Sequence, residues 1–272
     1  MVEGTFDSVA PAQWTSIATS QASSSTPARR LVEIRSYTAN NQISDQAIIK
    51  YGPHVTQLEA ENQRAAYEML NAKVVRVPQI YRFFSLGLNG YIVMENIKGF
   101  KIDLLEDACL IRKVADVLAQ FEKFTSPRPG PLRGNLVRGP FWPANDDIYV
   151  NSIEDVENFY TSRLGNTGAA LDLANLPFTL RHLDVSPRNI LWLPDGTFCL
   201  LDWESAGFYP RLFEVCEQQA LIGKDGNFNR LLLTHMKSLT AHEKAQGELL
   251  LWAYHNMQRY YLYESHEQGR QC

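Results

Sequence analysis

The sequence predicts an α+β chain with two lobes, because strand patterns come first and helical patterns dominate the remainder. Residues 31–97 alternate apolar and polar side chains over short segments, as half-buried strands do, with one helical stretch between them. Residues 98–272 carry mostly helical spacing, with strand patterns returning at residues 178–203. We therefore expect a small β-rich N-lobe and a larger helical C-lobe. Residues 15–28 are small and polar, with too few apolar side chains to anchor a core, so residues 1–30 are expected to form a flexible lead-in.

The composition is that of a globular protein with one large or two small domains, since 45% of the 272 residues are hydrophobic and 21% are charged. The 26 basic and 30 acidic residues give a net charge of −4, which offers no basic stripe for nucleic acid. The four cysteines lie far apart without a CxxC pair, which argues against a zinc ribbon or a disulfide scaffold. No apolar run is long enough to span a membrane, and residues 1–30 lack a signal-peptide core. These features predict a cytoplasmic protein without a membrane or nucleic-acid partner; they do not indicate an oligomeric state.

Strand and turn patterns define the N-lobe. Residues 31–35 alternate apolar and charged side chains, residues 38–41 are turn formers, and residues 47–51 read as a second strand. Apolar and small residues at helical spacing follow: Val55, Leu58, Asn62, Ala65, Ala66 and Met69. A hairpin with arms at residues 80–85 and 90–94 completes the lobe.

Capping signals mark two helices of the C-lobe. Asp103 with Glu106 resembles a capping box ahead of an apolar helical face, and Ser152 with Asp155 forms the same pattern ahead of another. Residues 125–147 between them are rich in Pro, Gly and Asn, which predicts an irregular loop.

A second hairpin carries the residues with the most informative chemistry. Strand-like segments flank a tight turn at residues 194–196, and pairing them across this turn brings Asn189 and Asp202 together at the open end. Asp184 lies five residues before Asn189, in the segment that leads to the same point. Three oxygen-bearing side chains are thus expected to converge.

Such a convergence suits a hard cation beside phosphate. Mg²⁺ takes a few carboxylate or amide oxygens, keeps several waters and binds substrate phosphates. Phosphoryl transfer needs a metal-binding carboxylate, a helping amide and a second carboxylate that faces a hydroxyl. Alternatively, each of these residues could simply form a turn, which explains any one of them but not the set.

The segment His182-x-Asp184-x-x-x-x-Asn189, followed by Asp202-Trp203, resembles the catalytic loop and metal-binding element of the aminoglycoside phosphotransferase and choline kinase type of family, in particular its fungal-type subgroup. The resemblance extends from about residue 31 to residue 217. It implies a two-lobed protein-kinase-like fold with a small antiparallel β N-lobe at residues 31–97 and a mainly helical C-lobe at residues 98–272. It also implies an ATP-dependent kinase that transfers the γ-phosphoryl group of Mg-ATP to a hydroxyl of a small-molecule acceptor.

The resemblance assigns roles in the C-lobe. Asp184 would be the catalytic base, and His182 would organise the catalytic loop. Asn189 and Asp202 would bind Mg²⁺, with Asn189 close to the nucleotide.

The resemblance also assigns nucleotide-binding residues in the N-lobe. Lys50, at the end of the second strand, would bind the phosphates. Its carboxylate partner would come from the next helix, with Glu59 the better match and Glu61 the alternative. Backbone groups of Glu95 and Ile97 would meet the adenine.

Two other functions compete with a small-molecule kinase. Residues 36–42 stand where a protein kinase has its glycine-rich loop, yet they contain no glycine, and a Cβ at every position hinders the approach of backbone amides to phosphate. This departure would suit a catalytically silent kinase fold that acts as a binding or scaffold module. A protein kinase fits less well, because only seven residues separate Asp202 from Pro210 and the helical pattern resumes at Phe213. So short a segment cannot form both an activation loop and a peptide-binding ledge.

Acidic residues after Asp202 bear on the choice of acceptor. Glu204, Glu214 and Glu217 would either face a cationic acceptor or form the solvated side of a helix. The sequence leaves both interpretations open and does not identify the acceptor.

Overall fold

The structure is a computed structural model that describes residues 39–102, 106–143, 146–222 and 226–268. The described residues divide into two units, the first formed by residues 39–60 and 79–96 and the second by residues 61–78 and 97–268. The expected lead-in and the strand expected at residues 31–35 lie outside the described residues.

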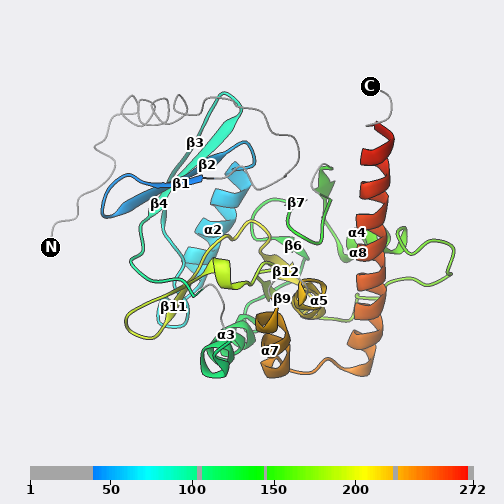
Figure 1. Ribbon diagram of the computed structural model, residues 1–272. Helices are drawn as coiled ribbons and strands as arrows, with labels where there is room; N and C mark the ends of the chain where they lie inside the picture. Colours follow the sequence, from blue (N-terminus) through cyan, green and yellow to red (C-terminus); the bar gives the residue numbers. More distant parts are fainter. Residues whose placement is uncertain (1–38, 103–105, 144–145, 223–225, 269–272) are drawn as a thin grey trace. The chain divides into compact units, whose positions relative to one another are not determined.

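Strands dominate the first part of the chain and helices the second, so the α+β class is confirmed (Figure 1). The elements are β1 (Ala39–Gln42), β2 (Ala47–Gly52), α2 (Gln57–Met69), β3 (Ile80–Leu86), β4 (Asn89–Glu95), α3 (Ala108–Phe121), β5 (Thr125–Ser126), β6 (Gly130–Pro131), β7 (Leu136–Val137), β8 (Ile148–Tyr149), α4 (Ile153–Thr161), β9 (Phe178–Arg181), η2 (Pro187–Asn189), β10 (Ile190–Trp192), β11 (Phe198–Leu200), β12 (Gly207–Tyr209), α5 (Leu212–Ala220), α7 (Asn227–His235) and α8 (Ala241–Gln268).

The first unit is built on an antiparallel sheet with the strand order β1-β2-β4-β3. The strand at residues 47–51 and both arms of the hairpin are confirmed. The turn expected at residues 38–41 is wrong, because residues 39–42 form β1 and pair with β2. The turn comes later, where the N–H groups of Ile43 and Ser44 both donate to the carbonyl of Ala47. Pairing with an apolar neighbouring strand outweighs the turn preference of the asparagines.

In the second unit, side-chain caps mark the beginning of α3 and α4. Asp107, not the expected Asp103–Glu106 pair, caps α3, and its carboxylate accepts from the N–H groups of Cys109 and Leu110 at 2.8 and 3.2 Å. Asp103 itself lies outside the described residues. The capping box of Ser152 and Asp155 at the start of α4 is confirmed.

The segment at residues 125–147 is less irregular than expected. Its two-residue strands β5 and β6 join β9 and β12 in a sheet of order β5-β9-β12-β6, and β7 pairs with β8. The close approach of β6 to β12 needs glycine, because a Cβ on Gly207 would lie 2.3 Å from the carbonyl oxygen of Gly130. Pairs this short arise from tertiary contacts and leave no periodic pattern in the sequence.

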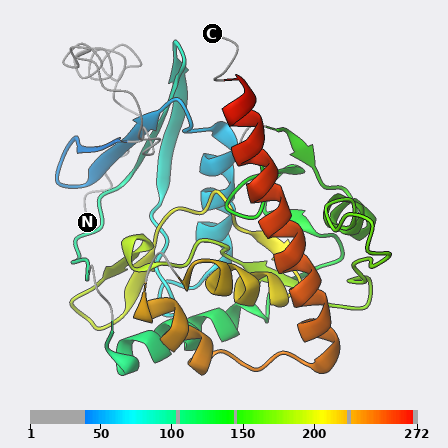
Figure 2. The same ribbon diagram turned by 45° about the vertical axis from the view of Figure 1, so that its right-hand side comes forward.

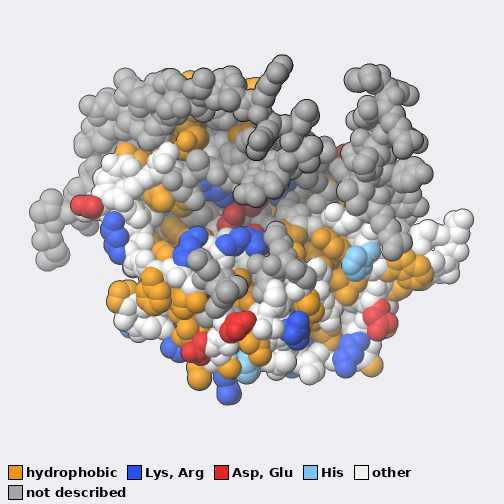
Figure 3. Space-filling model, viewed as in Figure 1, with side chains coloured by type: hydrophobic (Ala, Val, Ile, Leu, Met, Phe, Trp, Pro, Cys, Tyr) orange, Lys and Arg blue, Asp and Glu red, His pale blue; other side chains and the backbone are white. Residues whose placement is uncertain are grey.

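The helices of the second unit enclose two apolar clusters. One joins α3 and α7 to the β10–β11 hairpin and Trp203, and the other joins α4, α5 and α8 around Tyr160 and Phe213. The long helix α8 runs beside α5 and α4 in both views (Figures 1 and 2). Within the described part of the chain, no helix is both long and apolar enough to cross a membrane. On the visible described surface, Lys and Arg side chains are interspersed with acidic and apolar ones (Figure 3).

Gly90 provides a test of the packing in the first unit. A Cβ at this position would lie 1.8 Å from the carbonyl oxygen of Val55, so Gly90→Ala must displace backbone. We expect the substitution to lower the free energy of unfolding by about 2 kcal/mol or more, measured by urea denaturation. Ser85→Ala, at the exposed position opposite Gly90 on β3, is the control and should change stability little. Equal stability of the two variants would contradict this packing.

Candidate active site

The β10–β11 hairpin has the register that the sequence predicts. Ile190 pairs with Leu200, and the N–H of Leu201 donates to the carbonyl of Asn189 at 2.8 Å. The next residue after Leu201 is Asp202, so the hairpin places the backbones of Asn189 and Asp202 side by side at its open end. Asp202 has a φ of +63°, a left-handed conformation that non-glycine residues rarely adopt.

The loop between β9 and η2 turns sharply at its second residue. His182 is fully buried, its Nε2 lies 3.1 Å from the carbonyl oxygen of Leu201, and its ring meets the indole of Trp203 edge-on at 4.8 Å. Leu183 then adopts a φ of +58°. Strained backbone of this kind persists only where its surroundings hold it in place.

Glu214, on α5, supplies that support. Its side chain is fully buried and accepts from the N–H of His182 at 2.8 Å and from the N–H of Leu183 at 3.2 Å. Burial raises the pKa of the Glu214 carboxyl, while the nearby guanidinium of Arg181 opposes the rise. The carboxyl group of Glu214 therefore holds the loop between β9 and η2 at His182 and Leu183.

The expectation that Glu214 and Glu217 form a solvated helix face is wrong, whereas the alternative, that they face a cationic acceptor, stays a prediction. Both side chains are fully buried, so they do not form a solvated helix face, and Glu214 serves the loop backbone. Burial raises the pKa of Glu217 well above its ordinary value, and the amide of Gln218 donates to it at 2.5 Å. Only the position of Glu214 within the segment that resembles the family could have signalled its importance.

Asp184 is held on both carboxylate oxygens. Its Oδ1 pairs with the guanidinium of Arg188, and its Oδ2 accepts from Asn189 Nδ2 at 2.9 Å. The same amide nitrogen donates to the Asp184 carbonyl at 2.9 Å. The side-chain nitrogen of Asn189 therefore donates two hydrogen bonds. Its side-chain oxygen Oδ1 has no hydrogen-bond partner among the described residues.

The donor set suits Mg²⁺ with substrate phosphates better than an all-protein cage. The described residues contain no group of three His, Cys, Asp or Glu side chains that could hold a metal ion. The Asp202 carboxylate and the amide oxygen of Asn189 are hard oxygen ligands. Their backbones are neighbours across the open end of the β10–β11 hairpin. Mg²⁺ commonly binds through one or two such groups and takes its remaining ligands from water and phosphate. The residues present therefore fit this ion.

The first unit contains the other candidate residues. Lys50, on β2, forms an ion pair of 2.6 Å with Glu59, on the first turn of α2, and both side chains are largely buried. Glu59, the better match of the two glutamates considered, is thus a partner of Lys50 in the structure. Glu95 ends β4 and donates its N–H to the carbonyl of Gln79.

Ile97 is the first residue of the second unit in this part of the chain. Its N–H makes no hydrogen bond within the described residues, which leaves a backbone donor two residues beyond the end of β4.

The segment after Asp202 is short and fixed. The amide of Asn62 donates to the carbonyl of Glu204 at 3.1 Å and more weakly to that of Ala206 at 3.4 Å. Strand β12 follows at once and pairs with β9, and α5 begins at Leu212. A strand bonded into a sheet leaves no chain for a mobile activation loop.

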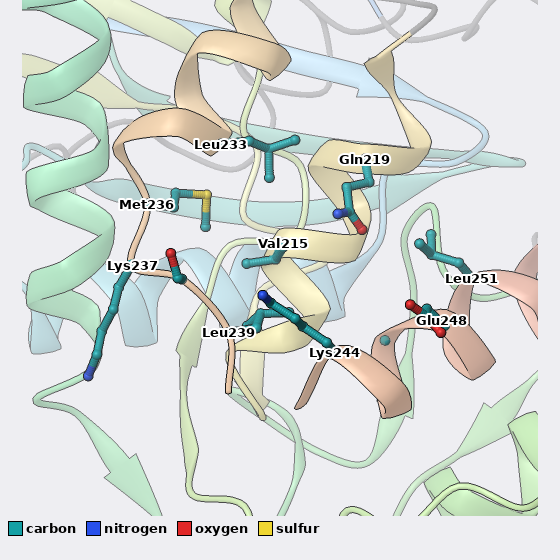
Figure 4. A pocket seen from close by; sticks show the side chains of 11 residues that line it. Val215, Gln219, Leu233, Met236, Lys237, Leu239, Lys244, Glu248 and Leu251 are labelled. Carbon is teal, nitrogen blue, oxygen red and sulfur yellow. The ribbon is translucent and has the colours of Figure 1, made fainter. Parts of the chain in front are cut away.

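A cavity of about 340 Å³ opens among α5, α7 and α8, on another side of α5 (Figure 4). Val215 and Gln219 of α5 line it, whereas Glu214 of the same helix faces the loop. None of Asp184, Asn189 and Asp202 borders this cavity, so it is not the place where the candidate chemistry lies.

Comparisons with known proteins bear on the family and the fold of the chain. The family model of the phosphotransferase enzyme family (APH) matches residues 35–226. The apo form of a thermostable mutant of aminoglycoside phosphotransferase APH(4)-Ia is similar with a TM-score of 0.55 and 13% identity, over 94% of this chain and 92% of that one. A protein of Haemophilus somnus 129PT, provisionally described as a fructosamine-3-kinase, gives a TM-score of 0.56 and 12% identity over 92% of each chain. A search of curated proteins found no match.

At such low sequence identity, the similarity to solved structures is evidence for the fold alone. They confirm the two-lobed, kinase-like architecture with a small antiparallel β lobe and a mainly helical lobe.

His182 makes the stability of the chain depend on pH. Burial lowers the pKa of this imidazole to about 4, from an ordinary value of 6.5. Protonation therefore favours the unfolded chain, and the stability due to neutral His182 is complete above pH 6.5 and is lost as the pH falls toward 4. The difference between the two pKa values corresponds to about 3 kcal/mol.

We expect the free energy of unfolding of wild type to fall more steeply between pH 7.5 and pH 4.5 than that of His182→Gln, as measured by urea denaturation at each pH. The glutamine amide can still donate to the Leu201 carbonyl but does not titrate. Parallel pH dependence in the two proteins would show that His182 is not buried in its neutral form.

Proposed function

The chain belongs to the phosphotransferase enzyme family, and on that basis we propose that it transfers the γ-phosphoryl group of Mg-ATP to a hydroxyl of a small-molecule acceptor. Membership of the family and the kinase-like fold support small-molecule phosphotransferase activity in general. The observation that carries the specific proposal is the Asp184 carboxylate, held by Asn189 at the open end of the hairpin that also presents Asp202.

In this proposal Asp184 is the catalytic base. The acceptor hydroxyl donates its hydrogen bond to the carboxylate, and the proton passes to Asp184 as the new oxygen–phosphorus bond forms and the bond to the ADP oxygen breaks. The bond from Asn189 fixes the orientation of the carboxylate. His182 is neutral and tied to Leu201, which supports an organising role for it in place of a proton-accepting one.

Asn189 and Asp202 would hold Mg²⁺ through one amide and one carboxylate oxygen. The ion, when bound, neutralises charge on the nucleotide phosphates. The commitment of the Asn189 nitrogen to Asp184 supports this assignment, since it turns the amide oxygen away from the base.

In the first unit, Lys50 would bind the nucleotide phosphates, and the buried Glu59 would hold its ammonium group in place. The strand end at Glu95 and the N–H of Ile97 would meet the adenine through backbone groups. The short, strand-bonded segment after Asp202 supports a small acceptor over a peptide. The cytoplasmic location and the fungal-type subgroup stay predictions from the sequence.

Asp184→Asn tests the base. An amide cannot take the proton, so turnover of an identified acceptor should fall by about 10²-fold or more, while calorimetric nucleotide binding persists. Asp195→Asn, at the exposed tight turn of the same hairpin, is the matched control and should keep wild-type turnover. Near-wild-type turnover of Asp184→Asn would rule out its role as the base.

Asp202→Ala and Lys50→Ala test the nucleotide site through binding alone. Titration calorimetry with ATP, with and without Mg²⁺, should show that Asp202→Ala loses the metal-dependent part of the affinity. Lys50→Ala should weaken binding by about tenfold under both conditions, because its contact is with phosphate directly. If Asp202→Ala and wild type bound ATP equally under every metal condition, the silent-fold alternative would be favoured.

A further inference from the structure

We propose that Arg188 is a mobile cation that leaves Asp184 for the phosphoryl group as transfer proceeds. This inference rests on the proposed function and adds a second residue that touches the reacting group. It arises from an ion pair that the proposed mechanism does not use, between the Arg188 guanidinium and Asp184 Oδ1.

The backbone of Arg188 is fixed while its side chain reaches solvent. Arg188 lies in the short 3₁₀ helix η2, where the N–H of Asn189 donates to the carbonyl of Ser186 at 3.0 Å. The ammonium of Lys101 donates to the Arg188 carbonyl at 2.8 Å. The Arg188 side chain is nevertheless 42% exposed, against 16% for Asp184. Arg188 therefore has a backbone held by hydrogen bonds and a guanidinium that reaches solvent.

The acceptor hydroxyl and Arg188 would compete for hydrogen bonds to the same carboxylate, that of Asp184. Oδ2 of Asp184 is held by Asn189, which is 6% exposed and bonded also to the Asp184 carbonyl, so this contact is part of the loop. Oδ1 is bonded by Arg188, whose side chain is more exposed than that of Asn189. A hydroxyl that approaches Asp184 from solvent thus meets Arg188 first, and displacement of the guanidinium opens Oδ1 to it.

The displaced guanidinium would have the transferred phosphoryl group close by to bind. An acceptor oxygen within hydrogen-bond reach of Asp184 lies roughly 3 Å from the carboxylate. The phosphorus it attacks lies roughly 3–3.5 Å further on. The Asp184 carboxylate would thus lie no more than roughly 6–6.5 Å from the attacked phosphorus, a distance that an arginine side chain can bridge. Charge spreads over those oxygens in the transition state, and guanidinium binds such oxygens bidentately.

No other basic side chain of this segment is available for that role. Residues 181–202 contain two arginines and no lysine. Arg181 is 2% exposed and donates to the Thr179 hydroxyl within the sheet, so it cannot reach a bound nucleotide. Arg188 is thus the cation of the segment that both contacts the base and reaches solvent.

Nucleotide affinity tests the proposal without reference to turnover. Calorimetry with Mg²⁺ would compare ADP with a non-hydrolysable ATP analogue for wild type, Arg188→Gln and Arg188→Lys. A contact with the γ-phosphoryl group predicts that Arg188→Gln weakens binding of the analogue by about tenfold and leaves ADP affinity unchanged, with Arg188→Lys in between. Arg133→Gln, which removes an exposed arginine paired with Glu68, should change neither affinity.

An equal loss of affinity for ADP and the analogue, or no loss for either, would overturn the role of Arg188. A wild-type protein that binds neither nucleotide would instead refute the proposed function, and the inference with it. The two failures are therefore distinguishable.

Chemical rescue supplies the kinetic test once an acceptor is known. Arg188→Ala should lower kcat by about 10²-fold or more with little change in the KM for the acceptor. Millimolar guanidine should restore part of that kcat, and should not affect Asp184→Asn. A variant whose loss appears as a higher KM, or one that guanidine does not rescue, would assign Arg188 to loop structure only.

Discussion

The buried carboxyl group of Glu214 is the constraint on which the candidate active site depends. The loop after β9 must reverse direction at Leu183, whose left-handed backbone is unfavourable for a leucine by about 1–3 kcal/mol. Two backbone N–H donors that would otherwise be buried without partners point into the turn, and both find Glu214. Each such donor left unpaired would cost about 1–3 kcal/mol. The carboxyl group of Glu214 on α5 thus stabilises the turn at Leu183, and this turn positions Asp184.

The positions of the other groups follow from this anchor. His182 begins the same turn, and its imidazole binds the carbonyl of Leu201, directly before Asp202. From the opposite side, the register of the β10–β11 hairpin ties Asn189 to Leu201. The hydrogen bond from Asn189 to Asp184 then connects the hairpin back to the loop that Glu214 holds. Polar side chains from three places in the sequence are therefore held by backbone geometry, and the Arg188 side chain is more exposed than those of His182, Asp184 and Asn189.

The sequence predicts the local features of this site and misses the distant ones. The hairpin register follows from a tight turn and two short apolar strands, and the helix cap at Ser152 follows from a four-residue pattern; both depend on neighbours in the chain. Glu214 could not be recognised in the same way, because its partners lie more than 30 residues earlier and only tertiary packing brings α5 beneath the loop. The strands β5 and β6 were missed for a similar reason, since two residues cannot display a period. The ion pair of Arg188 with Asp184 is likewise invisible in a pattern where arginine is an ordinary surface residue.

The central claim is that this loop serves transfer of phosphate to a small molecule. Its most direct test is ADP release by the wild-type protein with Mg-ATP, over a panel of small hydroxyl and amine compounds and a panel of generic peptides. The account predicts that at least one small hydroxyl compound raises ADP release well above the rate in buffer, and that mass spectrometry finds this compound phosphorylated on oxygen. Phosphorylation of the peptides without turnover of any small compound would contradict it.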